Sequence, residues 1–382
     1  MTPPRILVDA TAIPRDRGGV GRYLDGLLAA LAEGSGLPGA AQISVICQEH
    51  DAGVFATLGL NVIVAPRSIE RTPVRLLWEQ FALPSIVRRG GFDVLHSPHY
   101  TFPLRGRFGR VVTIHDLTFF TLPQTHSVGK RAFFRFWLRR LARRRFPVIA
   151  VSAATAEEFV RLLHADPARL TVALHGYDAQ VFRVPTSEQL AAFATRLTPP
   201  VTRWIAFLGT LEPRKNVAAL VAAYVALEPA GRPALLLAGG AGWDAAVAPA
   251  VAAATASGAD VRLLGYLPID ELSAFLGGAE LVAYPSLGEG FGLPVLEAMA
   301  AGACVLTTAE LALPEVGGEA VAYAGTSAPE LTAALTALLA DQPRRDDFRR
   351  RAVERAAGFT WQAAAATHRA AYATAAAAKA AR

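Results

Sequence analysis

The stretch GEGFGLPVLEAMAAG, residues 288–302, decides the fold of the second half of this chain. Proline is favoured in the first turn of a helix, so Pro294 predicts that Glu289 lies on a loop and Glu297 inside a helix. The loop glycines permit close approach of the backbone to a ligand, and the helix N-terminus behind them attracts anions. The apolar run before the loop, residues 280–286, predicts a buried strand. A strand, a glycine turn and a helix with two carboxylates are typical of a phosphate-and-hydroxyl site in an α/β protein, although a surface loop before an ordinary helix would share the bare spacing.

The composition indicates a globular protein of two domains. The 382 residues are too many for one ordinary core, and 52% are hydrophobic while only 18% are charged. Cys47 and Cys304 stand far apart in apolar runs, which favours reduced core residues over a disulfide. The first residues show no signal-peptide pattern, and no apolar run approaches the roughly 20 residues that span a bilayer. We therefore expect a cytoplasmic protein, whose net charge of +6 suits nucleic acid, an anionic membrane or a phosphorylated substrate.

The first half of the chain begins with a strand, a glycine turn and a helix. Residues 5–11 are an apolar run, Gly18 and Gly19 open the turn, and a helical apolar period follows at Leu24, Leu27, Leu28 and Leu31. The turn lacks the spacing of a dinucleotide-binding fingerprint. Further strand-like runs alternate with helical ones, which predicts an α/β protein with parallel, doubly wound sheets.

Polar residues follow one of these strands directly. Residues 110–120, RVVTIHDLTFF, end a strand in His115 and Asp116, and ligands bind at the carboxyl ends of strands in such sheets. His115 could contact a substrate, act as a general base or simply pack. His96 and His99 are three positions apart, which is a weak signal for a metal without a third ligand, and we expect no metal.

A basic amphipathic helix is predicted over residues 128–146. This segment holds eight Lys and Arg residues and no acid, with aromatic residues at helical spacing. The pattern favours a helix that lies on an anionic membrane or meets an anionic acceptor, although its apolar side could pack inside the domain while the arginines are merely solvated. Nucleic acid is less favoured because no recognised nucleic-acid module accompanies the helix. The residues predicted for this contact are Lys130, Arg131, Arg135, Trp137, Arg139 and Arg143.

A pair of cations lies at the carboxyl end of a later strand. The run RWIAFLGTLEPRKN, residues 203–216, places Arg214 and Lys215 after a buried strand and Gly209, where they could bind a diphosphate. The alternative is that Arg214 and Lys215 are merely solvated side chains on a surface loop. No D-x-D motif occurs in the chain, so a Mg²⁺ clamp on the diphosphate is not indicated.

Taken together, the EGFGLPVLEAMA segment with its E-x7-E spacing and the GTLEPRKN segment resemble the retaining glycosyltransferases of family 4. The resemblance implies two Rossmann-like domains facing across a cleft (the GT-B fold), with an acceptor-binding domain at 1–182, a linker at 183–200 and a nucleotide-sugar domain at 201–359. It also implies that the C-terminal helix, about residues 360–382, packs back on the first domain. Two departures stand out. Thr210 replaces an Arg that many relatives carry after the glycine, and His175 replaces the Asn that usually opens the segment between the domains.

The resemblance also assigns roles residue by residue. Glu289 meets the sugar side of the donor, Glu297 the ribose hydroxyls, His115 the transferred sugar, and Asp116 shapes that pocket. The resemblance also implies front-face attack, with the donor phosphate accepting the proton. No carboxylate of the N-terminal domain is a convincing nucleophile, and Asp116 is the only candidate worth testing. The loop at Gly18 and Gly19 is expected to lie beside the donor phosphates or sugar. The alternative is that it forms a plain tight turn. The residues expected at the donor are Gly18, Gly19, Gly209, Arg214, Lys215, Tyr266, Leu267, Glu289, Gly290, Phe291, Gly292, Leu293 and Glu297.

The implied activity is retaining, metal-independent and cofactor-free hexosyl transfer from a nucleotide-sugar to a saccharide or lipid-linked acceptor. The segments HSPHY (96–100), TIHDLTFF (113–120) and GTLEPRKN (209–216) look most like those of bacterial mannosyltransferases of O-antigen or exopolysaccharide assembly. This resemblance favours GDP-mannose as the donor and a peripheral location on the inner face of the cell membrane. A UDP-sugar donor remains an alternative. An epimerase or phosphorylase of the same fold and a non-catalytic binding protein recruited to membranes are the rival classes.

Overall fold

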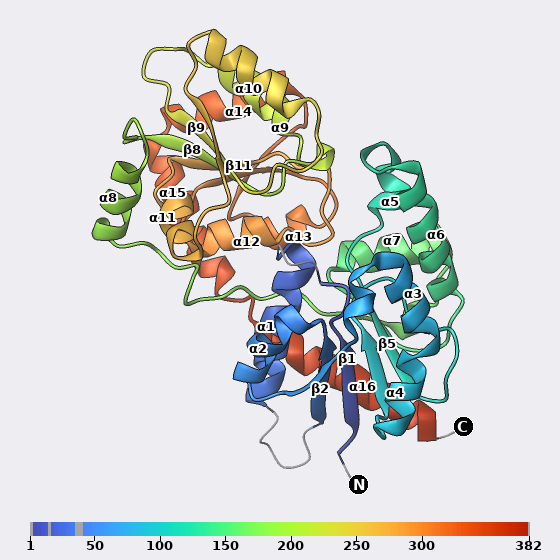
Figure 1. Ribbon diagram of the computed structural model, residues 1–382. Helices are drawn as coiled ribbons and strands as arrows, with labels where there is room; N and C mark the ends of the chain where they lie inside the picture. The colour runs from blue at the N-terminus through green and yellow to red at the C-terminus, as the bar shows by residue number, and fades with distance from the viewer. Residues whose placement is uncertain (1–2, 14–16, 35–40, 381–382) are drawn as a thin grey trace. The chain divides into compact units, whose positions relative to one another are not determined.

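The computed structural model describes residues 3–13, 17–34 and 41–380, and the chain divides into two compact units (Figure 1). Unit 1 comprises residues 1–120, 128–176 and 360–382, and unit 2 comprises residues 121–127 and 177–359. Each unit is built on one parallel β-sheet with helices on both faces, so both are Rossmann-like α/β units as the sequence predicts.

Unit 1 has a seven-stranded sheet in the order β3-β2-β1-β4-β5-β6-β7, and every pair of neighbours is parallel. The strands are β1 (Arg5–Asp9), β2 (Gln42–Cys47), β3 (Asn61–Val64), β4 (Val94–Ser97), β5 (Gly109–Ile114), β6 (Val148–Ala150) and β7 (Leu170–Val172). The helices are α1 (Gly19–Glu33), α2 (Glu49–Thr57), α3 (Thr72–Phe81), α4 (Leu83–Arg89), α5 (Thr118–Thr121), α6 (Val128–Ala142), α7 (Ala153–Leu163) and α16 (Trp361–Ala380).

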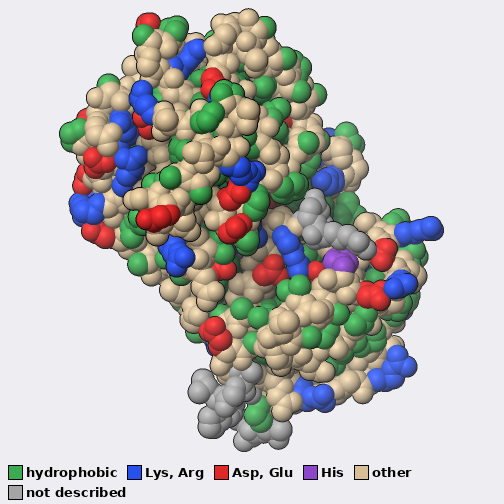
Figure 2. All heavy atoms as spheres, turned by 60° about the vertical axis from the view of Figure 1, so that its left-hand side comes forward, with side chains coloured by type: hydrophobic (Ala, Val, Ile, Leu, Met, Phe, Trp, Pro, Cys, Tyr) green, Lys and Arg blue, Asp and Glu red, His purple; other side chains and the backbone are tan. Residues whose placement is uncertain are grey.

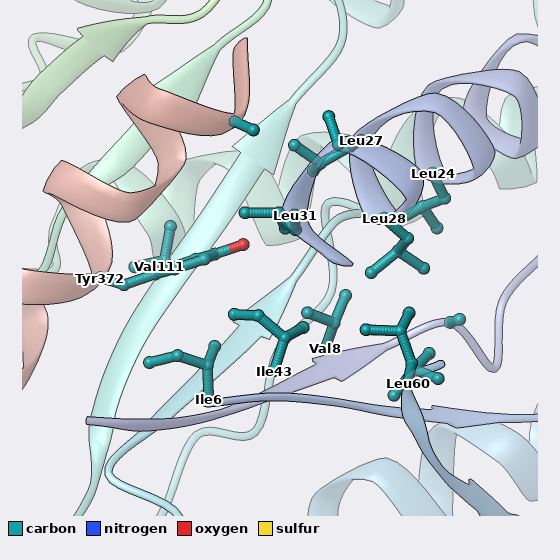
Figure 3. Packing of buried hydrophobic residues seen from close by; sticks show 14 of the residues in the cluster. Ile6, Val8, Leu24, Leu27, Leu28, Leu31, Ile43, Leu60, Val111 and Tyr372 are labelled. Atoms are coloured by element: carbon teal, nitrogen blue, oxygen red, sulfur yellow. The ribbon is translucent and has the colours of Figure 1, made fainter. Parts of the chain in front are cut away.

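Alternation along the strands divides the core of unit 1 into two faces. Ile6 and Val8 of β1 pack under α1 and α16, whereas Leu7 between them packs under α3 and α4 on the other face. Figure 3 shows the first face, where the predicted stripe of α1 meets the strands. The leucines of this stripe are fully buried, which confirms the helical period predicted from the sequence: Leu24, Leu27, Leu28 and Leu31.

The alanine-rich helix α16 lies against α1 and β5 of unit 1. Its buried face consists mainly of alanines, and small side chains let helix and sheet approach closely. A Cβ added at Gly109 of β5 would lie 2.6 Å from the Ala375 carbonyl oxygen, and one at Gly26 of α1 would lie 2.1 Å from the Trp361 ring. The alanine content therefore reflects close packing of α16 on unit 1.

A buried chain of hydrogen bonds fastens α16 to this sheet. His368 Nδ1 lies 2.7 Å from the Ala364 carbonyl, which can only accept, so this nitrogen carries the proton. Burial lowers the pKa of His368 to about 4, so the ring is neutral near pH 7 and its Nε2 accepts from the Tyr23 hydroxyl at 2.7 Å. Tyr23 in turn pairs with Thr113.

This chain of hydrogen bonds begins and ends on helix α16. The Thr113 hydroxyl accepts from His96 Nε2 at 2.8 Å, and His96 Nδ1 accepts from the Tyr372 hydroxyl at 2.9 Å. Burial holds the pKa of His96 well below its usual value, so this ring is neutral as well. Both histidine rings and the hydroxyls of Tyr23 and Thr113 then donate once and accept once, while the Tyr372 hydroxyl donates. A second proton on either ring would face a hydrogen-bond donor.

Unit 2 has a six-stranded parallel sheet in the order β10-β9-β8-β11-β12-β13. Its strands are β8 (Trp204–Leu208), β9 (Ala234–Ala238), β10 (Val261–Gly265), β11 (Leu281–Tyr284), β12 (Val305–Thr308) and β13 (Ala322–Ala324). Its helices are α8 (Ser187–Arg196), α9 (Val217–Val225), α10 (Val247–Ala256), α11 (Leu272–Gly277), α12 (Leu293–Ala300), α13 (Leu313–Gly317), α14 (Ala328–Ala340) and α15 (Gln342–Ala356).

The segment 183–200, predicted as a linker, instead contains α8 and belongs to unit 2. Thr186 and Gln189 form a reciprocal capping box that starts this helix. Phe193 is buried, with its ring 5.4 Å from the Trp204 ring and 5.8 Å from the Phe275 ring. Three prolines, which are frequent in linkers, flank this helix: Pro185, Pro199 and Pro200. The units separate between Gly176 and Tyr177 rather than after residue 182.

Candidate functional site

Two of the predicted donor residues, Glu289 and Glu297, occupy the local structures that Pro294 predicts. Glu289 lies on the loop after β11, and Glu297 lies inside α12 and is buried. Gly292 is the N-cap of α12 with φ +99, and a Cβ there would lie 2.8 Å from Leu313. Both the positive φ and the space require glycine at this position.

The centre of the site in unit 2 is an ion pair between Lys215 and Glu289. Lys215 Nζ donates to Glu289 Oε1 at 2.6 Å, although 74 residues separate them along the chain. Arg214 donates to the other oxygen of Glu289, to the Gly288 carbonyl at 2.8 Å and to Glu212 at 2.6 Å. The two predicted cations are thus held in place by two carboxylates.

Two hydroxyl groups complete this cluster, and sequence reasoning missed both. Tyr284, the last residue of β11, donates to Glu289 Oε1 at 3.0 Å and accepts from Lys215. Ser286 donates to the same Glu289 oxygen at 2.6 Å. The signal was present as Tyr-Pro-Ser directly before the glycine loop, where a strand ends beside the site.

The electrostatics keep Glu289 ionised. Burial alone would raise the pKa of Glu289, but Arg214 and Lys215, together with the hydrogen bond from Ser286, outweigh it and bring the pKa to about 2. Burial and the adjacent Arg214 lower the pKa of Lys215, while Glu289 and Glu212 act in the opposite direction. Burial and the negative charge of Glu289 hold the pKa of Tyr284 well above its usual value, so this phenol stays protonated. The cluster combines a fixed carboxylate with two oriented cations.

The other predicted donor residues of unit 2 lie around the carboxyl edge of the sheet. Gly209 follows β8, and Gly239 approaches it so closely that a Cβ on Gly239 would lie 2.2 Å from the Gly209 carbonyl oxygen. Tyr266 and Leu267 follow β10, and the Tyr266 ring is exposed beside Gly240. Leu293 begins α12 and is buried.

The side chain of Phe291, another residue predicted at the donor, is buried and packs edge-on against Phe359 at 6.1 Å. The ring is therefore part of the core of unit 2.

In unit 1, His115 and Asp116 lie at the carboxyl edge of β5 as predicted. His115 Nε2 donates to the Pro98 carbonyl at 2.8 Å, and burial lowers the pKa of His115. The ring is therefore neutral near pH 7, with Nδ1 as a hydrogen-bond acceptor. His115 also stacks edge-on against Tyr23 at 5.1 Å.

Asp116 is engaged in local structure. Its Oδ1 accepts from the Thr118 backbone N–H at 3.0 Å and from the Thr118 hydroxyl at 2.7 Å, which begins the short helix α5. These two hydrogen bonds occupy Oδ1 and form a local turn at the start of α5.

Gly18 and Gly19 begin α1 and are exposed, with nothing among the described residues within 4 Å of an added Cβ. His175, the residue that departs from the family pattern, packs beside Tyr23 at 4.9 Å and Trp361 at 5.5 Å. The Asn-to-His change thus adds a ring to the buried aromatic cluster next to His115.

The predicted membrane helix forms as α6, but Trp137 does not face outward. Trp137 is buried in the core with its ring 5.3 Å from the Phe102 ring. The exposed aromatic residue of α6 is its neighbour Phe136, beside Arg140 at 5.6 Å. Arg135 donates to the Phe119 carbonyl, and both Arg135 and Arg139 lie over the Phe120 ring. Of the remaining predicted residues, Lys130 and Arg131 lie in the first turn of the helix. The helix ends at Ala142 and not at residue 146 as predicted, so Arg143 lies just beyond it.

Within the described residues, no helix combines the length and the apolar character that crossing a membrane requires. The same residues hold one group with the composition of a metal site, formed by Asp9, Glu79 and His99. Arg75 and Thr101 already donate to Glu79, and Thr11 donates to Asp9, so these groups compete with a metal ion for the carboxylate oxygens.

Comparisons with known proteins agree with this arrangement. Residues 17–181 match the model of Glycosyltransferase Family 4, and residues 193–355 match that of Glycosyl transferases group 1. The O-antigen chain mannosyltransferase B of Escherichia coli is 28% identical over 272 residues, which cover 70% of this chain and 71% of that protein. The MMP alpha-(1->4)-mannosyltransferase of Mycolicibacterium hassiacum is 32% identical over 302 residues, which cover 73% of this chain and 70% of that protein.

Among solved structures, HepE of Anabaena in complex with UDP and glucose superposes with a TM-score of 0.74 at 17% identity, covering 95% of this chain and 97% of that one. This likeness supports the GT-B architecture of two Rossmann-like domains. The chain therefore belongs to the glycosyltransferases, with a family 4 N-terminal part followed by a group 1 C-terminal part.

Proposed function

We propose that the chain is a retaining, metal-independent hexosyltransferase that moves mannose from GDP-mannose to a saccharide or lipid-linked saccharide acceptor. Its place would be the assembly of a cell-surface polysaccharide. The observation that carries this proposal is the Lys215–Glu289–Arg214 cluster, because a buried lysine and a half-buried arginine, both oriented by carboxylates, suit a diphosphate. The relatives named mannosyltransferases support the choice of sugar.

In this mechanism, Arg214 and Lys215 bind the donor diphosphate and stabilise the negative charge that grows on it as the C1–O bond breaks. Glu297 accepts hydrogen bonds from the ribose hydroxyls, and Glu289 orients the sugar and both cations. Neutral His115 accepts a hydrogen bond from a sugar hydroxyl at Nδ1. The acceptor oxygen bonds to C1 on the face that the diphosphate leaves, and its proton passes to the departing phosphate oxygen. GDP and the α-linked product are released.

A UDP-sugar is the second candidate donor, and one observation favours it. HepE, which has the same fold, was solved with UDP and glucose. The loop at Tyr266 and Leu267 follows β10, where its backbone would read the edge of either base.

The membrane partner is part of the proposal. The basic face of α6, with exposed Phe136, suits an anionic membrane, so we place the enzyme on the cytoplasmic face as a peripheral protein.

A donor screen tests the function. The protein is incubated with GDP-mannose, UDP-glucose and UDP-N-acetylglucosamine, with and without EDTA, and products are identified by mass spectrometry and the anomeric proton by NMR. We expect an α-linked mannoside with saccharide acceptors, at the same rate in EDTA. An epimerised nucleotide-sugar formed without acceptor would instead identify an epimerase. The absence of any turnover, with donor binding retained, would favour a binding protein.

A further inference from the structure

Unit 1 has a hollow that lies away from the proposed transfer site. It has a volume of about 300 Å³, and its walls include Phe102, Arg110, Arg143, Arg144, Arg145 and Phe146. We call these six residues the arginine hollow. Its volume lies at the lower end of the range for small-molecule sites, roughly 300–1,000 Å³.

The topology places the arginine hollow at the amino edge of the sheet. Arg110 is the second residue of β5, and Phe146 lies two residues before β6 begins. His115 follows the other end of β5. A strand of six residues at about 3.3 Å per residue separates the two edges by roughly 20 Å. The arginine hollow is therefore distinct from the sugar-binding edge.

Three arginines of the hollow have no acidic partner among the described residues. Within this part of the chain, no carboxylate forms an ion pair with Arg143, Arg144 or Arg145. These arginines are not needed to satisfy the end of α6 either, because Arg169 donates to the carbonyls of Leu141, Ala142 and Arg144. Three guanidinium groups are thus available to an external anion.

A second run of three arginines in the same chain provides the contrast. Arg349, Arg350 and Arg351 of α15 each form an ion pair with a carboxylate of their own helix: Asp346, Asp347 or Glu354. Figure 2 shows such mixing of basic and acidic side chains over the face that it draws. The same sequence, Arg-Arg-Arg, therefore has paired charges at 349–351, whereas no described carboxylate pairs with the run at 143–145.

Exposed apolar side chains lie on the elements beside the hollow. Gln80 of α3 bonds the backbone of Phe102 and Leu104, which joins α3 to the wall of the hollow. On α3, Leu77 is 62% and Phe81 is 71% exposed, and Phe136 on α6 is 51% exposed. Exposed apolar groups mark an interface with a protein or a membrane, and in combination with Arg143, Arg144 and Arg145 they suit the surface of an anionic membrane.

We propose that the arginine hollow binds the phosphate of an anionic phospholipid headgroup and docks unit 1 on the membrane. The inference rests on the proposed function for its membrane setting, and it names the lipid chemistry and the residues. Phosphate is a bidentate partner for guanidinium, and half-buried Phe146 adds an apolar wall to the hollow.

Vesicle co-sedimentation tests this assignment. The full-length protein is mixed with phosphatidylcholine vesicles, with or without 30% phosphatidylglycerol (about one anionic lipid in three), in low and moderate salt. We expect binding only to the anionic vesicles, weakening as salt rises. Arg143→Ser with Arg145→Ser should weaken it about tenfold or more. The matched control, Arg350→Ser with Arg351→Ser, removes the same charge and should bind like wild type.

Several outcomes would overturn the proposal. The first is an equal loss of vesicle binding in the two double variants, and the second is equal binding of the wild type to neutral and anionic vesicles. Full competition by millimolar sn-glycerol 3-phosphate would identify a free phosphate compound as the ligand. Full competition by a short DNA duplex would identify a general polyanion. Circular dichroism confirms that each variant is folded. Donor binding by the wild type without vesicles is measured separately, so a protein that binds nucleotide-sugar but ignores vesicles refutes the docking site alone.

Discussion

Lys215 and Glu289 form a buried ion pair of 2.6 Å that joins the end of β8 to the loop before α12. The pair explains how a site for an anionic diphosphate keeps its cations in position, because Glu289 also holds Arg214. Removing one partner leaves the other charge buried and unpaired, which is costly.

Lys215→Met should lower kcat/KM for donor transfer at least about 100-fold, which corresponds to roughly 2.7 kcal/mol of lost transition-state stabilisation. Glu289→Gln should produce a loss of similar size, since both cations lose their counter-ion. Lys379→Met, at the exposed ion pair with Asp93, is the control and should remain near wild type. If both site variants stayed within tenfold of wild type, the cluster would not be the donor site.

Tyr284→Phe should weaken donor binding about five- to tenfold, because the hydroxyl that bridges Lys215 and Glu289 is lost while the ring volume is kept. The effect should fall mainly on the donor KM. Tyr224→Phe removes a hydroxyl that donates only to backbone carbonyls of the same unit. It should lower the melting temperature and leave the donor KM unchanged. If Tyr284→Phe lowered the melting temperature and left the donor KM unchanged, Tyr284 would only support the fold.

The histidine chain predicts acid sensitivity of unit 1. His368 has a folded pKa of about 4 against an ordinary value near 6.5, so below pH 6.5 the unfolded chain binds a proton that the folded chain does not. Stability is therefore lost as the pH falls from 6.5 to 4, on the order of 3 kcal/mol in total from this group. Urea denaturation at pH 7.5, 6.5, 5.5 and 4.5 measures the loss. The free energy of unfolding of His368→Gln should depend less on pH than that of the wild type. An equally steep pH dependence in the variant would contradict the assignment to His368.

Substitutions at two glycines distinguish a residue that the backbone conformation requires from a residue that contacts the ligand. Gly292→Ala should destabilise the protein by roughly 1–2 kcal/mol, because φ is +99 and the added Cβ meets Leu313. Gly18→Ala meets no described neighbour, so its melting temperature should match wild type while its kcat/KM for donor transfer falls. An unchanged kcat/KM for Gly18→Ala would favour a plain turn.

The elements that local chemistry controls were predictable from the sequence. Pro294 placed Glu289 and Glu297 correctly on a loop and a helix, and the leucine period of α1 identified its buried face. The return of α16 to unit 1 could be expected from the family resemblance only. Its physical basis, the hydrogen-bonded chain from Tyr372 to His368, joins side chains far apart in sequence.

Three features depended on packing that no local pattern encodes. Helical spacing groups Trp137 with Leu138 and Leu141 on one side of α6, but only the packing against residues such as Phe102 shows that this side faces the core and not a membrane. Phe193 turns an apparent linker into a helix of unit 2 because Trp204 and Phe275 receive it. The pairing of Lys215 with Glu289 and Tyr284 required the order of the strands, since β8 and β11 are neighbours in the sheet.

The most direct test of the central claim is the melting temperature of the wild type and of Lys215→Met with GDP-mannose at about 100 times its dissociation constant for the wild type. Saturation at that level adds roughly 2.7 kcal/mol of stability, so the wild type should melt several degrees higher with GDP-mannose, while Lys215→Met should show little change. A UDP-sugar that stabilised the wild type in place of GDP-mannose would revise the donor and keep the site. A wild type that no nucleotide-sugar stabilises, or a variant stabilised as strongly as the wild type, would contradict the account.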